Sequence, residues 1–403
     1  MAKTLPKEKN VSTSNIYQLD GRVQLGAAVP SGLQHGLAMF VANLTPITMI
    51  GAASGLDSAQ IAVLLQNAMF VAGIATLIQL YPVWRVGSRL PIVMGVSFTF
   101  VTILSYIGAS YGYQTVVGSV LVGGLIEGTL GLLAKYWRRI ITPVVAASVV
   151  TAIGYSLFTV GTRSFGGGYT EDFGSAHNLI LGTITLVTCL LFNILAKGYL
   201  KQLSVLAGLI VGYVAALLTG AVDLSQIFSG GFVSLPRPLP YMPEFHLGAI
   251  ASTTIIFLVS AAETIGDSTA VVSGALGREI ETREISGSIA CDGYASAISG
   301  LFGCPPVTSF SQNVGLVTMT KIVNRFALAT GAVFLILCGL LPKLAALISI
   351  MPQSVLGGAA VMMFSSIVMS GIQLITKKPL TPRSITIVSV ALGLGYGIGA
   401  NSG

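Results

Sequence analysis

Thirteen long apolar stretches limit the folds open to this 403-residue chain. Lipid offers no hydrogen-bond partner to an exposed backbone group, so each stretch is expected to be helical. Only 9% of the residues are charged, against about 25% in a typical soluble domain. The chain is therefore predicted to be an all-α polytopic membrane protein, not a soluble enzyme, a disordered chain or a nucleic-acid binder. The predicted spans are 31–51, 58–82, 91–108, 114–134, 142–162, 178–196, 202–221, 248–272, 285–303, 305–320, 325–346, 354–375 and 384–400.

The basic residues predict how these spans are oriented. With the N-terminus inside and strict alternation of the spans, 18 of the 21 Lys and Arg residues fall on the inside, and within the spans Lys or Arg occurs only near the two ends of 325–346, at Arg325 and Lys343. The three outside are Arg163, Arg237 and Lys343. The net charge of +7 thus reflects topology, and the polar residues 1–30 are predicted to be a cytoplasmic tail of a protein in the cytoplasmic (inner) membrane.

The order of the spans predicts an inverted repeat. Seven spans precede a proline-rich outside linker at 222–247, and an odd number of crossings gives the second half the opposite orientation. The third span of each half is short and opens on proline, at Pro91 and at Pro305-Pro306. A 7+7 repeat needs a fourteenth span after Gly403, so the last helix is expected to be missing, by truncation or because the protein has thirteen spans.

Four acidic residues lie inside apolar spans: Glu127, Glu263, Asp267 and Asp292. Each carboxylate at mid-bilayer costs about 2.5–3.5 kcal/mol, so these residues must face protein or water. Glu263 and Asp267 are four residues apart and share a helix face, where two like charges do not both ionise readily. At least one is expected to hold a proton, which is what proton coupling requires. The alternatives are a structural hydrogen bond for Glu263, contact with water for Asp267, and close helix packing for the glycine-flanked Glu127.

The tenth span carries the densest polar cluster, at residues 308–315. A short helix after Pro305-Pro306 leaves free N–H groups near the middle of the membrane, where they attract acceptor atoms. The amide of Gln312 offers two donors and one acceptor in a plane, which suits the edge of a flat heterocycle. Phe98, in the matching third span, is placed to stack on such a ring or simply to pack. His35, in the first span, is either functional or ties helices together.

These residues form motifs of a known family. Gln312-Asn313-Val314-Gly315, followed by Thr320-Lys321, matches the signature of the nucleobase–ascorbate transporters, also called nucleobase:cation symporter-2. Gln34-His35 resembles the QH motif of that family, 262–267 resembles its eighth-helix motif, and Asp292 falls at its ninth-helix aspartate. From about residue 30 the chain resembles this family, and within it the bacterial xanthine and uric acid permeases.

The resemblance implies fourteen helices in two inverted repeats of seven, with short strands that cross before the third and tenth helices. It implies a core domain, a gate domain that mediates a homodimer, and an elevator movement of the core against the gate. The core comprises 31–134 and 248–346, and the gate comprises 142–221 and 354–403.

The resemblance also implies roles for the site residues. Glu263 and Gln312 are expected to hydrogen-bond the base, Phe98 to stack on it, and the backbone near Ser311 to complete the site. Asp292, Asn313, His35 and Asp267 are expected to form the supporting and proton-coupling network. Transport by proton symport is implied, with Na⁺ as the alternative coupling ion, and no metal, other cofactor or enzymatic activity is expected. Gln312, where uracil carriers tend to have Glu, favours a purine, either xanthine or uric acid.

Other functions remain open from the sequence. A uracil or pyrimidine symporter of the same family is the nearest alternative. An anion carrier on the same fold needs positive charge at its site, and no Lys or Arg lies in the interior of a span. An aspartyl protease is disfavoured because Ile265-Gly266-Asp267 follows Thr264 where its motif requires glycine. A passive channel would give uptake without accumulation.

The four cysteines lack metal-ligand spacing and are predicted to be free and buried.

Overall fold

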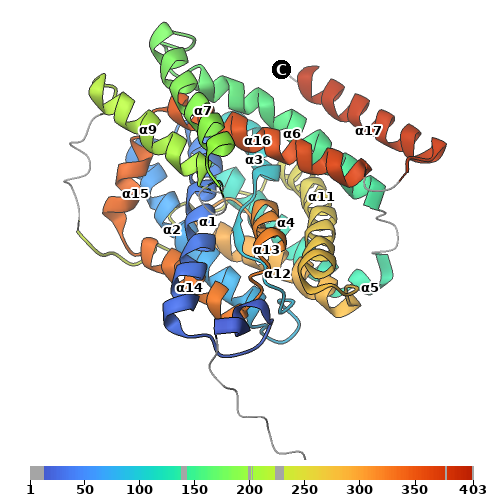
Figure 1. Ribbon diagram of the computed structural model, residues 1–403. Helices are drawn as coiled ribbons and strands as arrows, with labels where there is room; N and C mark the ends of the chain where they lie inside the picture. The colour runs from blue at the N-terminus through green and yellow to red at the C-terminus, as the bar shows by residue number, and fades with distance from the viewer. Residues whose placement is uncertain are drawn as a thin grey trace, which may run out of the picture.

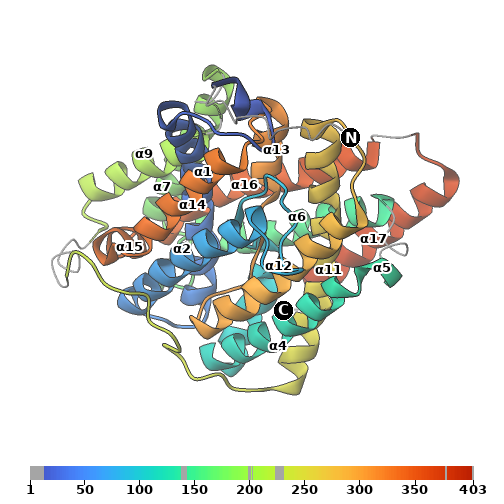
Figure 2. The same cartoon turned by 90° about the horizontal axis from the view of Figure 1, so that it is seen from below.

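A computed structural model of the protein describes residues 13–137, 143–197, 201, 203–222, 231–376 and 379–401. Figures 1 and 2 show the helices from two directions. The first half contains η1 (Thr13–Tyr17), α1 (Leu25–Ala53), α2 (Ser58–Leu80), β1 (Met94–Val96), η2 (Phe98–Phe100), α3 (Val101–Tyr111), α4 (Tyr113–Leu132), α5 (Ala134–Trp137), α6 (Pro143–Phe165), α7 (Ala176–Leu195) and α9 (Ser204–Leu218). The second half contains α11 (Leu247–Val271), η3 (Val272–Leu276), α12 (Thr282–Leu301), β2 (Val307–Ser309), α13 (Ser311–Thr320), α14 (Arg325–Cys338), α15 (Pro342–Ser349), α16 (Gln353–Thr376) and α17 (Pro382–Asn401).

Of the thirteen predicted spans, 325–346 corresponds to two helices, and each of the others corresponds to a helix or to a strand followed by a helix. By length and composition alone, six helices of the described residues can cross a membrane, or seven if α14 and α15 count as one span. Helices α3 and α13 are too short to cross a membrane on their own, because they have only 11 and 10 residues. The predicted span 325–346 is not one straight helix: α14 and α15 meet at 79°, because Pro342 at the start of α15 cannot continue a helix.

Several helices begin where a polar side chain caps the first turn. Asp57 and Gln60 form a reciprocal capping box at the start of α2, with bonds of 2.8 and 2.9 Å. Ser175 caps α7 and Asn324 caps α14 by accepting backbone N–H groups. These local signals fix the first turn of helices whose stability otherwise comes from packing.

The two halves pack in the same way around each other. Helix α4, the fourth span of the first half, packs against α11 and α12, the first two helices of the second half. Helix α14, the fourth span of the second half, packs in turn against α1 and α2 (Figure 2). This reciprocal exchange is the arrangement expected of two related halves that enter the membrane in opposite directions.

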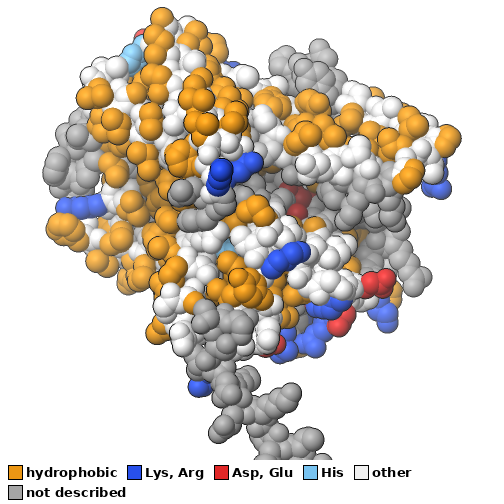
Figure 3. Space-filling model, in the orientation of Figure 1, with side chains coloured by type: hydrophobic (Ala, Val, Ile, Leu, Met, Phe, Trp, Pro, Cys, Tyr) orange, Lys and Arg blue, Asp and Glu red, His pale blue; other side chains and the backbone are white. Residues whose placement is uncertain are grey.

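The helix contacts divide into two groups, which we call the first and second packing groups. The first contains α1–α4 and α11–α15, and the second contains α6, α7, α9, α16 and α17 (Figure 1). The contacts between the groups are fewer and involve α1, α3 and α11 on one side and α6, α9 and α16 on the other. Figure 3 shows apolar side chains spread over the outer surface of α7 and α9, where Ile194 and Leu218 are 74% and 83% exposed. Such a surface suits contact with lipid.

Close helix packing in the first group depends on glycine. A Cβ added at Gly124 of α4 would lie 2.7 Å from the Ala297 nitrogen and the Gly293 oxygen of α12. At Gly128, one turn further, it would lie 2.9 Å from the ring of Tyr294. The backbones of α4 and α12 therefore approach more closely than any larger residue allows.

The strands β1 and β2 form an antiparallel pair in the middle of the first group. Met94 faces Ser309, and Val96 faces Val307. The pairing extends at both ends, because Ser97 N–H donates to Pro306 O at 3.0 Å and Phe310 N–H donates to Val93 O at 3.1 Å. All six strand residues are buried.

Side chains of neighbouring helices satisfy the outer edges of this two-stranded sheet. On the β1 side, Met94 N–H donates to the Thr76 hydroxyl at 2.9 Å and Val96 N–H to the Asn43 amide oxygen at 2.7 Å. On the β2 side, Val307 N–H donates to the Ser296 hydroxyl at 3.1 Å. Extended backbone is tolerated at this depth because protein groups replace the missing partners. The sheet thereby positions the starts of α3 and α13, where the candidate site lies.

The four cysteines are free and buried, as predicted.

Candidate functional site

The acidic face of α11 meets the start of α13 at the end of β2. Ser311, the first residue of α13, has its hydroxyl oxygen 2.9 Å from Glu263 Oε1 and 2.7 Å from Asp267 Oδ2. The Thr99 hydroxyl donates to the other carboxyl oxygen of Glu263 at 2.7 Å. The two acids, four residues apart on α11, therefore converge on one hydroxyl group.

This arrangement requires a proton on one of the two acids. A serine hydroxyl has a single hydrogen to donate. If Ser311 donates it to one carboxyl group, its contact with the other is a hydrogen bond only when that second carboxyl carries a proton and acts as the donor. Without that proton, two oxygens would face each other with no hydrogen between them. This geometry favours a proton on one member of the pair Glu263 and Asp267.

A small cavity of about 30 Å³ lies beside this cluster. Four of the residues predicted to bind substrate meet there: Glu263, Gln312, Phe98 and Ser311. The other lining residues are Ser97, Thr99, Ile153, Ser309, Phe310 and Ile367. Its volume suits about one water molecule. Room for a larger ligand requires the second packing group, which supplies Ile153 and Ile367, to move away.

The ring of Phe98 closes one side of the cavity. Phe98 packs against Phe364 of α16, with ring centroids 5.4 Å apart and an edge-to-face angle of 82°. In this arrangement Phe98 packs as an ordinary aromatic residue between the two groups, the alternative that its sequence position left open. Its position in the cavity wall also makes a ring face available when α16 is displaced.

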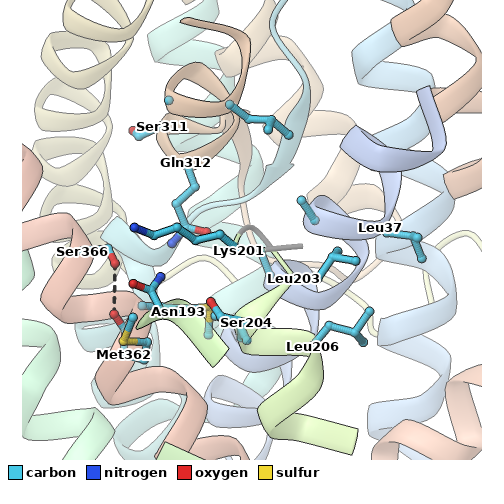
Figure 4. A pocket seen from close by; sticks show the side chains of 16 residues that line it. Leu37, Asn193, Lys201, Leu203, Ser204, Leu206, Ser311, Gln312, Met362 and Ser366 are labelled. Atoms are coloured by element: carbon cyan, nitrogen blue, oxygen red, sulfur yellow. Dashed lines mark hydrogen bonds between the residues drawn. The ribbon is translucent and has the colours of Figure 1, made fainter. Parts of the chain in front are cut away.

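A larger pocket of about 230 Å³ adjoins the same residues, because Ser311 and Gln312 line both spaces. Helices α1 and α13 form one wall, and α7, α9 and α16 form the other. Figure 4 shows the Gln312 side chain extending into this pocket toward the end of Lys201. The Gln312 amide has no hydrogen-bond partner among the described residues. Lys201, which was predicted to lie outside the spans, lines this pocket.

Asp292 of α12 lies behind the cavity and is fully buried. Its carboxyl group accepts hydrogen bonds from the Thr264 hydroxyl and from the Ser309 N–H and hydroxyl, the two Ser309 bonds to Oδ1 both being 3.1 Å. Asp292 does not line either space. It connects α11 and α12 to the last residue of β2, directly before α13.

His35 of α1 and Asn313 of α13 form a second buried link. Asn313 Nδ2 and His35 Nδ1 are 2.8 Å apart, and both side chains are almost fully buried. His35 Nε2 and Asn313 Oδ1 have no partner among the described residues. The pair attaches the first helix of the chain to the residue that follows Gln312.

Glu127 of α4 is fully buried and does not belong to this hydrogen-bond network. Neither of its carboxyl oxygens has a hydrogen-bond partner within the described parts of the chain. The glycines on either side bring α4 against α12, as expected from their sequence positions. An unpartnered carboxyl in such a place is far less costly when it is uncharged.

Thr99, Ser309 and Lys201 are site residues that sequence reasoning missed. Thr99 stands one residue after Phe98, and its hydroxyl is unremarkable in sequence. Ser309 belongs to the polar run but was not distinguished within it. Lys201 was assigned to a loop. No group of three or more metal-binding side chains occurs among the residues that the structure describes.

Comparison with known proteins decides the family. The model of a family described as the Permease family matches residues 26–401. The chain belongs to this permease family. The family is that of the nucleobase–ascorbate transporters, as the motifs predicted, and the permease is a multi-pass membrane transporter, not an enzyme.

The permease is similar to several characterised relatives. It is 34% identical to the xanthine permease XanQ of Escherichia coli strain K12, an alignment that covers 95% of this chain and 86% of XanQ. It is 33% identical to the uric acid permease PucJ of Bacillus subtilis strain 168, covering 92% of this chain and 84% of PucJ.

Solved structures confirm the fold class. The transmembrane domain of the cyanobacterial bicarbonate transporter BicA superimposes on the permease with a TM-score of 0.65 at 16% identity, covering 92% of this chain and 96% of that domain. Murine Slc26a9, an anion transporter in the inward-facing state, gives a TM-score of 0.65 at 12% identity and covers 91% of this chain and 65% of its own. The permease shares the 7+7 inverted-repeat fold of these proteins.

Proposed function

We propose that the permease carries an oxidised purine, xanthine or uric acid, across the cytoplasmic membrane together with a proton. The observation that carries this proposal is the proton-sharing cluster of Glu263, Asp267 and Ser311 next to the free amide of Gln312. The relatives named as xanthine and uric acid permeases support the substrate class.

The base is held by its edge and by one face. Glu263 and the Gln312 amide hydrogen-bond the alternating C=O and N–H groups of the ring, since both line the small cavity and Gln312 has donors and an acceptor free. Phe98 stacks on the ring after α16 has moved away from it. Asp292 and the pair His35–Asn313 keep β2 and α13 in position, because each anchors a residue adjacent to the site.

Proton coupling follows from the number of protons that the acid pair needs. A second negative charge at Glu263 and Asp267 would leave one carboxylate without a donor from Ser311 and would oppose the first charge in a low dielectric. A proton must therefore be present when the site is closed, and it can leave when the cluster meets water. Base and proton then travel together because both depend on Glu263. We infer H⁺ as the coupling ion, and no cofactor is required.

The transport movement is an elevator-type displacement of the first packing group, the core, against the second, the gate. The 230 Å³ pocket between the groups supports this inference, because it adjoins the predicted substrate residues Ser311 and Gln312. Lys201 lies on a predicted inside connection, so the structure corresponds to a site that opens toward the cytoplasm. The gate, whose α7 and α9 present apolar surfaces, mediates a homodimer.

The proposal is tested with Glu263→Gln. Cells expressing the variant are expected to lose accumulation of labelled xanthine and uric acid, because glutamine keeps the shape of the carboxyl group but cannot exchange a proton. The measurement is uptake of a panel of purines and pyrimidines with and without an uncoupler, with membrane insertion checked by immunoblot. Glu171→Gln, at an exposed residue, is the matched control and should transport normally.

Undiminished accumulation by Glu263→Gln would contradict the coupling role. Wild-type uptake of uracil in place of purines would instead identify a pyrimidine carrier. Uptake that never exceeds the external concentration and ignores the uncoupler would identify a passive channel.

A further inference from the structure

We infer that the 230 Å³ pocket is a second, cytoplasm-facing binding site for the anionic form of an oxidised purine, with Lys201 as its positively charged group. The inference rests on the proposed function and adds to it a substrate charge and a residue that selects for it. The site adjoins the small cavity but is distinct from it, since only Ser311 and Gln312 line both.

Charge is the first argument. Lys201 is the sole charged side chain among the described residues that line the pocket. The ion pairs found in the described structure, Arg278–Glu284 and Arg325–Asp20, do not involve it. The acids Glu263 and Asp267 do not line this pocket. A lysine ammonium with no carboxylate partner, facing a half-open pocket, favours an anion there.

Shape and lining are the second argument. Apolar residues line both walls: Leu37 and Ala38 lie on α1, and Met362 and Met363, whose flexible side chains adapt to a flat ring, lie on α16. Figure 4 shows Lys201 extending across the pocket beneath Gln312. The volume of 230 Å³ is slightly below the roughly 300 Å³ at the lower end for drug-sized ligands, which are larger than a bicyclic base.

Polar groups around the pocket suit the edge of such a ring. Asn193 of α7 supplies an amide from the gate side, and Gln312 supplies one from the core side. Ser204 adds a hydroxyl at the start of α9. Two amides facing each other across a pocket can bind two edges of one oxopurine, whereas a small inorganic anion would satisfy only part of this set.

The ligand class follows from acid–base chemistry. Uric acid is a weak acid that is mainly a monoanion at mildly acidic pH, whereas xanthine is then mainly neutral. The negative charge spreads over the ring and its carbonyl oxygens, within reach of both the ammonium and the amides. Lys201 should therefore favour uric acid over xanthine at the cytoplasmic side, beyond any preference of the small cavity.

The test compares Lys201→Met with Lys201→Arg and with the matched control Lys197→Met, which removes a charge from an exposed residue of the same connection that does not line the pocket. Inside-out vesicles containing each full-length variant present the cytoplasmic face to labelled uric acid or xanthine at mildly acidic pH. We expect Lys201→Met to raise the KM for uric acid about three- to fivefold, the effect of losing one solvent-accessible charge contact. The KM for xanthine should stay unchanged, Lys201→Arg should restore the wild-type value, and Lys197→Met should match wild type.

Equal effects of Lys201→Met on the two bases, or equal effects of the two methionine variants, would overturn the inference while leaving purine transport intact. An unchanged KM for uric acid in Lys201→Met would do the same. Wild-type vesicles that transport neither base would overturn the proposed function as well.

Discussion

Ser311 is the residue that joins the two acids of the site. Its hydroxyl group contacts the carboxyl groups of both Glu263 and Asp267, so a shift of α13 would change the hydrogen bonding of both acids. Any ligand that takes over the contact of Ser311 with one acid changes the proton balance of the other. In the proposed mechanism, substrate and proton are linked through this side chain, which does not itself titrate near neutral pH.

Gln312 offers a direct test of base recognition. In Gln312→Glu the side chain loses both amide donors, and a buried acceptor of the purine is left unpaired. We expect purine uptake to fall about tenfold or more, with uptake of uracil appearing, because a mismatched polar edge is strongly rejected. The measurement is competition of unlabelled bases against labelled xanthine and uric acid in whole cells.

Gln114→Glu, which adds the same charge at an exposed residue of α4, is the control for insertion and expression. An unchanged substrate profile in Gln312→Glu would remove Gln312 from the site.

The sequence identified the residues whose chemistry is unusual for a membrane but not those whose chemistry is common. The sequence pointed to Glu263, Asp267 and Asp292 because an acidic residue in an apolar span is costly unless it faces protein or water. Thr99 was not distinguished, since threonine hydroxyls inside helices usually bond to their own backbone. Lys201 was read as a topology signal, and only the folded chain shows that its connection reaches the pocket.

At the scale of elements, the boundary between α4 and α12 limits which substitutions the core tolerates. Gly124→Val places carbon atoms against the Ala297 and Gly293 backbone, which cannot retreat as a flexible side chain would. Overpacking of this kind costs about 1–3 kcal/mol. The apparent Tm in detergent should fall by roughly 2–10 °C, as measured by intrinsic fluorescence during heating.

Gly393→Val in α17 is the matched control, because a Cβ there meets nothing within 4 Å. Equal thermal shifts in the two variants would show that the α4–α12 contact is less tight than its geometry indicates.

Apolar patterning predicted where each span lies, but not its internal shape. The bend between α14 and α15 escaped the prediction because the apolar run continues through Gly339 and Pro342 and is interrupted only by Lys343. The short spans were recognisable from Pro91 and Pro305-Pro306. That their leading residues pair with each other was implied by the family resemblance and not by composition, since pairing joins segments about 200 residues apart.

For the whole molecule, the orientation of the chain is the property most open to test. The distribution of Lys and Arg predicts that the N-terminus is cytoplasmic and that the connection before α11 lies outside. Met242→Cys, at a residue 70% exposed in that connection, should react with an impermeant maleimide on intact cells. Arg283→Cys, at the exposed start of α12, should react only after permeabilisation.

The four native cysteines are buried and should contribute little background to this labelling. Reaction of Arg283→Cys on intact cells, with Met242→Cys protected, would invert the predicted topology.

The 7+7 fold itself was predictable from the sequence, because span order, short third spans and charge distribution are properties of the entire chain. The contact surface between the packing groups was not, since it depends on which faces meet.

The pairing of β1 with β2 has a consequence for assembly. The connection between α9 and α11 separates two pieces of chain, each of which contributes one strand and one half-length helix. A piece synthesised by itself would retain strand N–H and C=O groups in the bilayer interior with no counterpart. Each half therefore needs the other to complete its backbone hydrogen bonds at the β1–β2 pair.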